Sequence, residues 1–266
     1  MDWSRIKTIF IITFLILDAY LLFQFMKIRD ANQYEIKTET KFEDKLKLDE
    51  IKIDVELPKT QIKAQYLSAK PKIFTKEDTA KLKGQIAAID AQGTIMNVTF
   101  EKPVQLSDKF EPSELASLLK DSILNGDQYQ FWKRDEEKGS ITYFQQYDKV
   151  PLYENINGML TFYYNEENQI VSYQQSYLED IEKMAEKEEI LAPLKAIETL
   201  YQKGELEPKT TITKVELGYS TLIQLTASQV LAPTWRFVID DKESLFVNAF
   251  EGQIIEFNSE EKISVE

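Results

Sequence analysis

The chain has 266 residues, of which 45 are Asp or Glu and 32 are Lys or Arg, so its formal net charge is −13. This acidity argues against a nucleic-acid partner, because an acidic chain repels phosphate backbones. The chain also contains no cysteine and no histidine, which excludes thiol catalysis, disulfide bonds, Ser-His-Asp catalysis and zinc-peptidase chemistry within it. We therefore predict a protein that is not an enzyme and has no catalytic residue, cofactor or metal site.

An apolar run at residues 8–26 follows a short tail at residues 1–7. A helix of this length spans about 30 Å, which matches the hydrocarbon core of a bilayer. The run is longer than the apolar core of a signal peptide, and no small-residue cleavage site follows it. It predicts an uncleaved, single-pass signal anchor in the cell membrane.

Positive charges flank this run on both sides, so counting them does not fix its orientation. A long domain, however, crosses the membrane largely regardless of such charges. We expect residues 1–7 in the cytoplasm and the whole C-terminal part outside.

Asp18 interrupts the apolar run close to its middle. An ionisable side chain at the bilayer centre costs on the order of 2.5–3.5 kcal/mol on insertion scales, and lipid offers it no hydrogen-bond partner. Asp18 either contacts a polar or basic group on another membrane helix, or is tolerated in its protonated form because the rest of the helix is so apolar. In the first case, apolar residues on the same helical face complete the contact. The predicted partner-contact seam is Ile11, Phe14, Leu15, Asp18, Leu22 and Phe25.

The rest of the chain predicts an α+β extracytoplasmic part. It begins with a charged stalk at residues 27–47, followed by a first module at 48–177 and a second module at 178–266. Alternating or β-rich runs predict strands at 51–57, 61–69, 94–100, 140–147, 158–164 and 169–177, then at 212–219, 221–227, 234–240 and in a hairpin at 244–257.

Helix signals lie between these strands. Thr75 and Asp78 have the spacing of a capping box. Residues 111–126 and 193–204 each begin with a proline in the first turn and end with a glycine, which predicts two further helices. The charged run at 178–190 also predicts a helix.

The order of a helix followed by antiparallel strands occurs twice, and two sequence echoes accompany it. DKVPLYEN at 148–155 resembles DKESLFVN at 241–248, and TFYYNEENQIVSY at 161–173 resembles LFVNAFEGQIIEF at 245–257. The two alignments compete, because they use different registers. Both indicate two related modules, each an antiparallel sheet with a helix packed on one face.

Nine aromatic residues lie between Tyr143 and Tyr177. A sugar-stacking face is one interpretation, and ordinary strand composition explains them as well. Hydrolysis by paired carboxylates is formally open, although pairs such as Asp240–Asp241 are expected by chance in so acidic a chain.

Several stretches resemble the YycI family (also called WalI) of single-pass regulators in Gram-positive bacteria. They are MDWSRIKTIFIITFLILDAYLLFQF at the N-terminus, ITYFQQYDKVPLYENINGMLTFYYNEENQIVSYQQ at 141–175, and LAPTWRFVIDD with LFVNAFEGQIIEF near the C-terminus. The resemblance implies a sister protein, YycH, built of similar modules. It also implies a position beside the sensor histidine kinase WalK (YycG), which with its response regulator WalR (YycF) controls cell-wall metabolism. The family's partner-contacting membrane helix falls on Ile6–Met26.

The resemblance implies a non-catalytic regulator that acts on the transmembrane helices of a WalK-like kinase together with a YycH-like protein. The modules also look loosely like PepSY-type domains, which leaves an alternative. In that alternative the outer part binds wall fragments or a secreted peptidase, and the helix is only an anchor. Replacing the helix by an unrelated one separates the two, because only the first function is then lost.

Overall fold

The computed structural model describes residues 3–58, 60–224 and 228–257, without the side chains of residues 4–6, 8–9, 25–41 and 224. The fold is α+β, as predicted, with two antiparallel sheets. The chain divides into two compact units. The first comprises Met1–Lys52 with Leu206–Thr211, and the second comprises Ile53–Glu205 with Ile212–Glu266.

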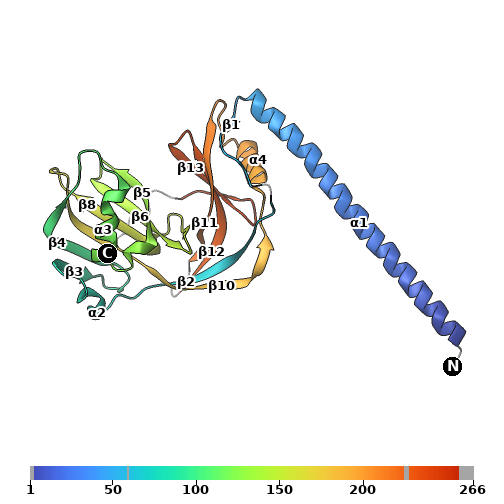
Figure 1. The fold of residues 1–266 in the computed structure, drawn as a ribbon, viewed down its shortest axis with the longest axis horizontal. Coiled ribbons are helices and arrows are strands. Elements are labelled where there is room, and N and C mark those ends of the chain that lie inside the picture. Colours follow the sequence, from blue (N-terminus) through green and yellow to red (C-terminus); the bar gives the residue numbers. More distant parts are fainter. Residues whose placement is uncertain (1–2, 59, 225–227, 258–266) are drawn as a thin grey trace. The chain divides into compact units, whose positions relative to one another are not determined.

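The first unit is dominated by one uninterrupted helix, α1 (Trp3–Leu48), drawn in blue in Figure 1. Its 46 residues correspond to a length of about 69 Å. The predicted membrane segment at 8–26 and the predicted stalk at 27–47 are thus parts of the same helix. Within the described residues, we find no helical segment with the length and apolarity needed to cross a membrane.

Segment 206–211 holds the C-terminal end of α1. The amide of Lys209 donates to Asp49 O over 2.9 Å, and the amide of Lys52 donates to Thr210 O over 3.0 Å. Four described apolar side chains of this unit are buried: Phe42, Leu46, Ile51 and Leu206. Backbone hydrogen bonds therefore fix the residues that immediately follow the helix.

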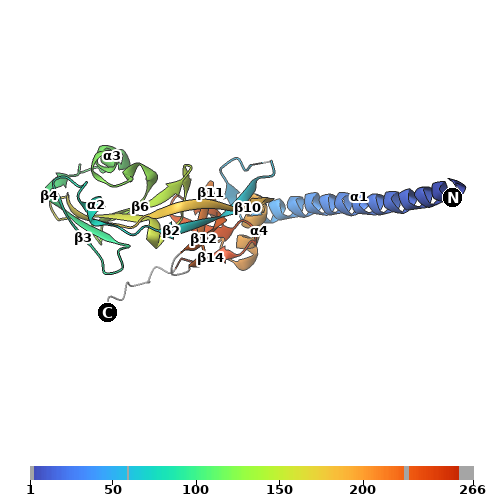
Figure 2. The same ribbon diagram turned by 90° about the horizontal axis from the view of Figure 1, so that it is seen from below.

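The second unit contains two sheets. Sheet A follows the order β1-β11-β12-β13-β14, and β2 pairs with both β12 and β10. Its strands are β1 (Lys52–Ile53), β2 (Lys63–Pro71), β10 (Leu178–Glu189), β11 (Thr211–Gln224), β12 (Gln229–Ile239), β13 (Glu243–Asn248) and β14 (Ile254–Ile255). The long strands β2 and β10 run side by side in Figure 2.

Sheet B follows the order β3-β4-β9-β8-β6-β5, and the short β7 pairs with β6. Its strands are β3 (Gln85–Ile89), β4 (Met96–Gln105), β5 (Tyr129–Asp135), β6 (Ser140–Tyr147), β7 (Val150–Pro151), β8 (Met159–Tyr164) and β9 (Gln169–Gln175). The helices of this unit are α2 (Lys76–Thr79), α3 (Ala116–Ser122) and α4 (Pro193–Lys203), with 3-10 turns η1 (Pro112–Leu115), η2 (Gly126–Gln128) and η3 (Ile156–Gly158).

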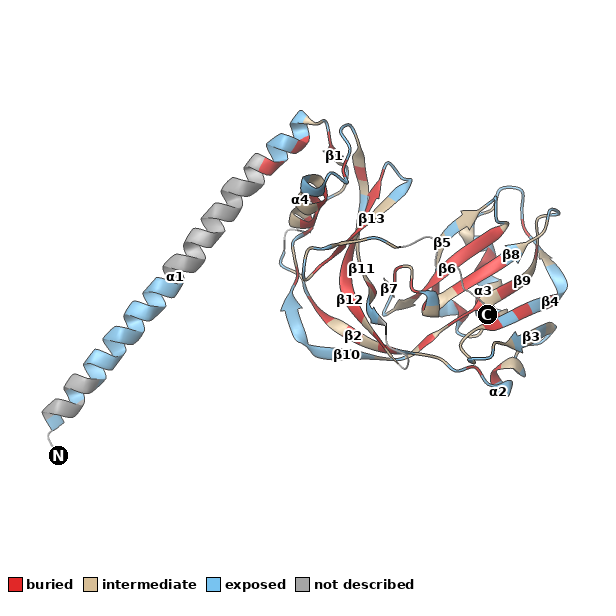
Figure 3. Cartoon of the chain, turned by 180° about the vertical axis from the view of Figure 1, so that it is seen from behind, coloured by how far each residue is buried: buried red, intermediate tan, exposed pale blue. Residues whose placement is uncertain are grey.

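The core of sheet B forms where α3 packs on one face of the sheet. Leu119 of α3 belongs to the same buried cluster as Val98 of β4 and Phe162 of β8. Figure 3 shows the buried residues of β6, β8 and β9 in red. Each large apolar side chain that is fully buried stabilises the fold by about 1.5–3 kcal/mol, so this cluster is the main source of stability for the sheet.

Each sheet contains a helix followed by four strands that pair in succession. In sheet B, α3 precedes β5, β6, β8 and β9; in sheet A, α4 precedes β11, β12, β13 and β14. The hairpin echo of the sequence has a structural counterpart. Asn168 and Gly252, which occupy equivalent positions in that alignment, have left-handed φ angles of 60° and 69°. That the two modules are related stays a prediction.

The second echo lies at the turns that end β6 and β12. Asp148 and Lys149 have positive φ angles at the first turn, and Asp240 and Asp241 have them at the second. The backbone angles align Asp148 with Asp240, whereas the sequence echo aligns Asp148 with Asp241. The turn residues of this echo and the hairpin echo fit the same strand order when residues 150–158, which lie between β6 and β8, are counted as an insertion.

We name residues 150–158 the joint segment, because they connect sheet B to sheet A. The amide of Tyr153 donates to Tyr219 O in β11 over 2.7 Å. Asn155 Nδ2 donates to Gln229 Oε1 in β12 over 2.7 Å, and this asparagine is buried. These bonds link the joint segment, which lies between β6 and β8 of sheet B, to strands β11 and β12 of sheet A.

Gly218 in β11 makes room for the joint segment. A Cβ at this position would lie 2.7 Å from Pro151 O and still closer to the ring of Tyr153. Real Cβ atoms do not approach neighbours so closely. The pairing therefore requires glycine at position 218.

The prediction of a helix at 178–190 is wrong, because residues 178–189 form β10. Glu and Lys favour helices when nothing else decides, but here β2 offers a strand to pair with. Cross-strand ion pairs accompany the pairing, with Lys70 Nζ 3.2 Å from Asp180 Oδ2 and Lys63 Nζ 4.0 Å from Glu189 Oε1.

The helix predicted at 111–126 is shorter than expected and is flanked by the turns η1 and η2. Strand β5, which follows it, was not predicted. The strands predicted at 212–219 and 221–227 belong to one strand, β11, as far as the structure describes them.

Strand β2 belongs to the chain segment 48–177, yet it pairs with β10 and β12 of sheet A. No single boundary in the sequence therefore separates the strands of the two sheets. The module boundaries stay predictions.

We predict that Gly218→Ala lowers the free energy of unfolding by about 1–3 kcal/mol, because the new methyl group overpacks the joint. Chemical denaturation of the full chain measures this change. In a Tyr153→Ala background the cost should fall, because the nearest atoms are then missing. An equal cost in both backgrounds would contradict the steric explanation.

Candidate functional site

The predicted seam lies along one face of α1. Successive residues of an α-helix turn by about 100°, so its six residues fall within an arc of about 100°. Four apolar members are largely exposed, with exposed fractions of 65% for Ile11, 59% for Phe14, 66% for Leu15 and 61% for Leu22. The side chain of Phe25 lies outside the described residues. The apolar residues on the other faces of this run are equally exposed. Contact between the seam and a partner stays a prediction.

Two other polar residues of the run satisfy each other. Gln24 Nε2 donates to Tyr20 OH over 3.1 Å, and this pair lies about 120–160° around the helix from Asp18. In the part of the chain that the structure describes, no hydrogen bond or ion pair reaches the exposed Asp18 carboxylate. Asp18 is therefore the residue of this run with most to gain from a polar group on a neighbouring helix.

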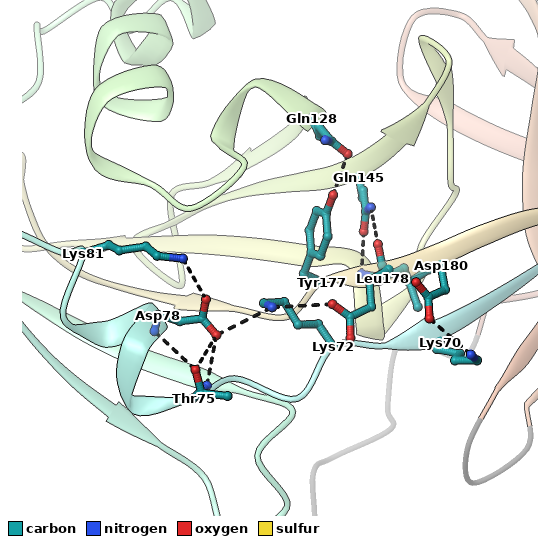
Figure 4. A network of polar contacts seen from close by, with 11 residues as sticks. Lys70, Lys72, Thr75, Asp78, Lys81, Gln128, Gln145, Tyr177, Leu178 and Asp180 are labelled. Carbon is teal, nitrogen blue, oxygen red and sulfur yellow. Dashed lines mark hydrogen bonds and ion pairs between the residues drawn. The ribbon is translucent and has the colours of Figure 1, made fainter.

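In the second unit, charged side chains gather where the chain leaves β2 for sheet B and returns into β10 (Figure 4). We name this region the crossing. Lys72 Nζ lies 3.6 Å from Asp78 Oδ2 and 3.5 Å from Glu179 Oε2. Since Lys72 and Glu179 belong to the outgoing and the returning chain, the lysine connects the two.

Asp78 is the buried member of the crossing. Thr75 N and Thr75 Oγ1 donate to its Oδ2 over 3.0 and 3.1 Å, which confirms the predicted capping box. Burial by itself raises the pKa of Asp78, but the hydrogen bonds from Thr75 and the charge of Lys72 outweigh it and hold the pKa below its ordinary value. The carboxylate is thus stabilised in its charged form.

Gln145 completes the crossing from inside sheet B. Its Nε2 donates to Leu178 O over 2.8 Å, and Leu178 N donates back to its Oε1 over 2.8 Å. The glutamine is fully buried. Its side-chain amide makes the two hydrogen bonds that a neighbouring strand would otherwise make to the backbone at the start of β10.

Sequence reasoning missed the residues of the crossing other than the Thr75–Asp78 pair. One signal was available, because Gln145 occupies the same strand face as Tyr143 in β6 and is a polar residue at a core position. Lys72 carries no comparable signal, since its partner Glu179 lies more than a hundred positions further along the chain.

A small cavity lies beside the joint segment. Its volume is about 20 Å³, which is enough for about one water molecule. The guanidinium of Arg236 lies 4.3 Å from the centre of the Trp132 ring, and its Nη1 donates to Glu216 Oε2 over 3.0 Å. The cavity is lined by Gln130, Phe131, Trp132, Phe144, Pro151, Tyr153, Glu216 and Arg236. This arrangement packs the joint and leaves no room for a larger ligand.

The nine aromatic residues give little support to a sugar-stacking face. Tyr143, Tyr153, Phe162 and Tyr173 are all at least 98% buried. Burial raises the pKa of Tyr143 to about 12, as expected for a hydroxyl removed from water. These residues build the core.

The model of the YycI protein family matches residues 31–250 of the chain. The chain belongs to the YycI family. This family is regulatory and non-catalytic, and membership supports a regulatory role in the YycG (WalK) system. It also suggests partnership with the YycG histidine kinase and a YycH-like protein.

Solved structures with low sequence identity are similar to this YycI-family chain. YycH from Bacillus subtilis is 15% identical with a TM-score of 0.42, and the match covers 74% of this chain and 54% of that one. An uncharacterized protein from Eubacterium rectale is 11% identical with a TM-score of 0.45, covering 79% and 91%. The C-terminal domain of YpeB from Bacillus megaterium is 10% identical with a TM-score of 0.37, covering 74% and 87%. No protein with a curated description matches significantly.

We predict that the stabilising effect of Asp78 depends on pH. Its folded-state pKa is lowered, so its contribution is complete above the unfolded value of about 3.9 and is lost as the pH falls through the folded value. At neutral pH, Asp78→Asn should lower the free energy of unfolding by about 1–3 kcal/mol. Denaturation of both proteins between pH 2 and 7 measures the difference.

The matched control is Glu77→Gln at an exposed neighbouring position of α2. It should leave stability nearly unchanged over the same range. A constant difference between the wild type and Asp78→Asn down to pH 2 would contradict the electrostatic explanation.

Proposed function

We propose that this chain is a non-catalytic, single-pass regulator in the cell membrane that modulates a WalK-type sensor histidine kinase. It acts through contacts between α1 and the transmembrane helices of the kinase, together with a YycH-like sister protein. Its N-terminus is cytoplasmic and its second unit lies outside. The family match supports the regulatory role, and the apolar sequence of residues 8–26 supports the anchor.

The observation that carries the proposal is Asp18 on an otherwise apolar face. Helices gain no hydrophobic free energy by associating in lipid, so packing and interhelical hydrogen bonds decide which partners they choose. A polar or basic group on a kinase helix would satisfy Asp18 and offset its insertion cost. The large apolar side chains around it would then pack against the same helix.

The test is co-purification of the kinase from membranes of the native host, with expression of wall-metabolism genes as a second readout. An interhelical hydrogen bond contributes about 0.6–2 kcal/mol, so Asp18→Leu should reduce kinase recovery by about 3- to 30-fold. Replacing residues 8–26 by an unrelated membrane helix should abolish recovery. Both variants should change gene expression.

Gln24→Leu is the matched control, because it removes a polar residue of the same run on a different face. It should recover the kinase as the wild type does. If the helix replacement changes neither recovery nor expression, α1 is only an anchor and the proposal is wrong.

A further inference from the structure

Three described strands of at least five residues pair along one side only: β3, β5 and β10. They differ in charge. Strand β5 (YQFWKRD) ends in three charged residues, and β10 (LEDIEKMAEKEE) is charged along most of its length. Strand β3 (QIAAI) carries no charge. It is therefore the least protected of these edges.

The contrast with β10 is also geometric. The pairing of β10 with β2 is irregular between Glu179 and Glu182 and again between Met184 and Glu188. Bulges and charged side chains are the devices by which natural sheets prevent other strands from pairing with an edge. Strand β3 keeps an unbroken register with β4, so it has neither device.

The free backbone groups of β3 follow from its pairing with β4. Hydrogen bonds from Glu101 N to Gly84 O (3.0 Å) and from Asp90 N to Ile95 O (2.9 Å) flank the strand. Antiparallel pairs alternate between bonded and non-bonded positions. The N–H and C=O groups of Gln85, Ala87 and Ile89 therefore point away from β4, toward the open edge.

The residues next to Ile86 on the solvent face of the sheet are also uncharged. Ile86 is 67% exposed on the face of sheet B opposite the core. Thr99 of β4 and Ser172 of β9 lie next to it in the same row of the sheet. Asn97 and Gln174 follow in the neighbouring row and bond to each other over 3.0 Å. A second neutral surface can approach here without charge repulsion.

We propose that β3 is a dimerisation edge that pairs antiparallel with β3 of a second copy, about a two-fold axis at Ala87. In this register Ile86 of each copy lies opposite Ala88 of the other, so a large side chain meets a small one. About six backbone hydrogen bonds form, and the strand order β3-β4-β9-β8-β6-β5 of one copy continues through β3 into the same strands of the second copy.

A second copy can occupy this edge in spite of the acidity of the chain. Each chain carries a net charge of −13, so most faces of two copies repel each other. The β3 edge is a neutral place where they can meet. It is also self-complementary, as a two-fold interface requires. The inference does not depend on contacts of α1.

The first experiment uses disulfide trapping in the full chain, which has no native cysteine and therefore no background. Two tagged single-cysteine variants, Ile86→Cys and Ala88→Cys, are mixed and oxidised. Directly opposite residues lie within disulfide reach, so the mixed dimer should form in large excess over either variant alone. Leu222→Cys on β11, also exposed, is the control and should give only background. Mixed dimer at the control level would overturn the proposal.

The second experiment measures the mass of the detergent-solubilised full chain by light scattering. Ala88→Lys places a charge beside the edge and should convert dimer to monomer, whereas Leu222→Lys should not. A dimer that survives Ala88→Lys would overturn the proposal and would point to association through α1. The proposal would also be overturned if oxidation in native membranes links the Ile86→Cys variant only to a different protein.

Discussion

The second unit depends on how closely the joint segment approaches β11 at Gly218. The hydrogen bond from Tyr153 N to Tyr219 O requires the two backbones to lie at strand distance. At that distance the ring of Tyr153 occupies the space of a missing Cβ. Two further contacts lie beside this approach. Arg236 covers the Trp132 ring, and Phe246 lies against the Tyr153 ring. Because Gly218 has no side chain, the joint segment that follows β6 of sheet B can pack against β11 of sheet A.

Local sequence signals predicted the parts of the fold that local physics decides. The capping box at Thr75, the proline and glycine that bound α4, and the hairpin between β8 and β9 all appear in the structure. Strand β10 was missed because its pairing with β2 joins residues more than a hundred positions apart, and its composition favours a helix. The joint segment was missed for a similar reason, since Gly218 has a clear role only when Tyr153 is known to lie beside it.

The candidate seam could be predicted further than the crossing could. Helical periodicity alone places Ile11, Asp18 and Leu22 on one face, and the structure adds that Tyr20 and Gln24 satisfy each other elsewhere. The partner of Asp18 cannot follow from one sequence, because it belongs to another chain. The crossing is different, since Lys72 connects Asp78 with Glu179, which lies more than a hundred positions further along the chain.

In the proposed function, regulation through α1 requires two arrangements of the kinase helices that bind it with different affinity. A ten-fold preference corresponds to about 1.4 kcal/mol, which is within the range of one interhelical hydrogen bond. Under that proposal, one hydrogen bond to Asp18 would be enough to supply the preference. The residues after α1 are bonded to segment 206–211 through hydrogen bonds at Asp49 and Thr210. That segment continues directly into β11, the strand against which the joint segment packs. In the proposed function, the sign of regulation would depend on which of the two kinase arrangements binds α1 more tightly.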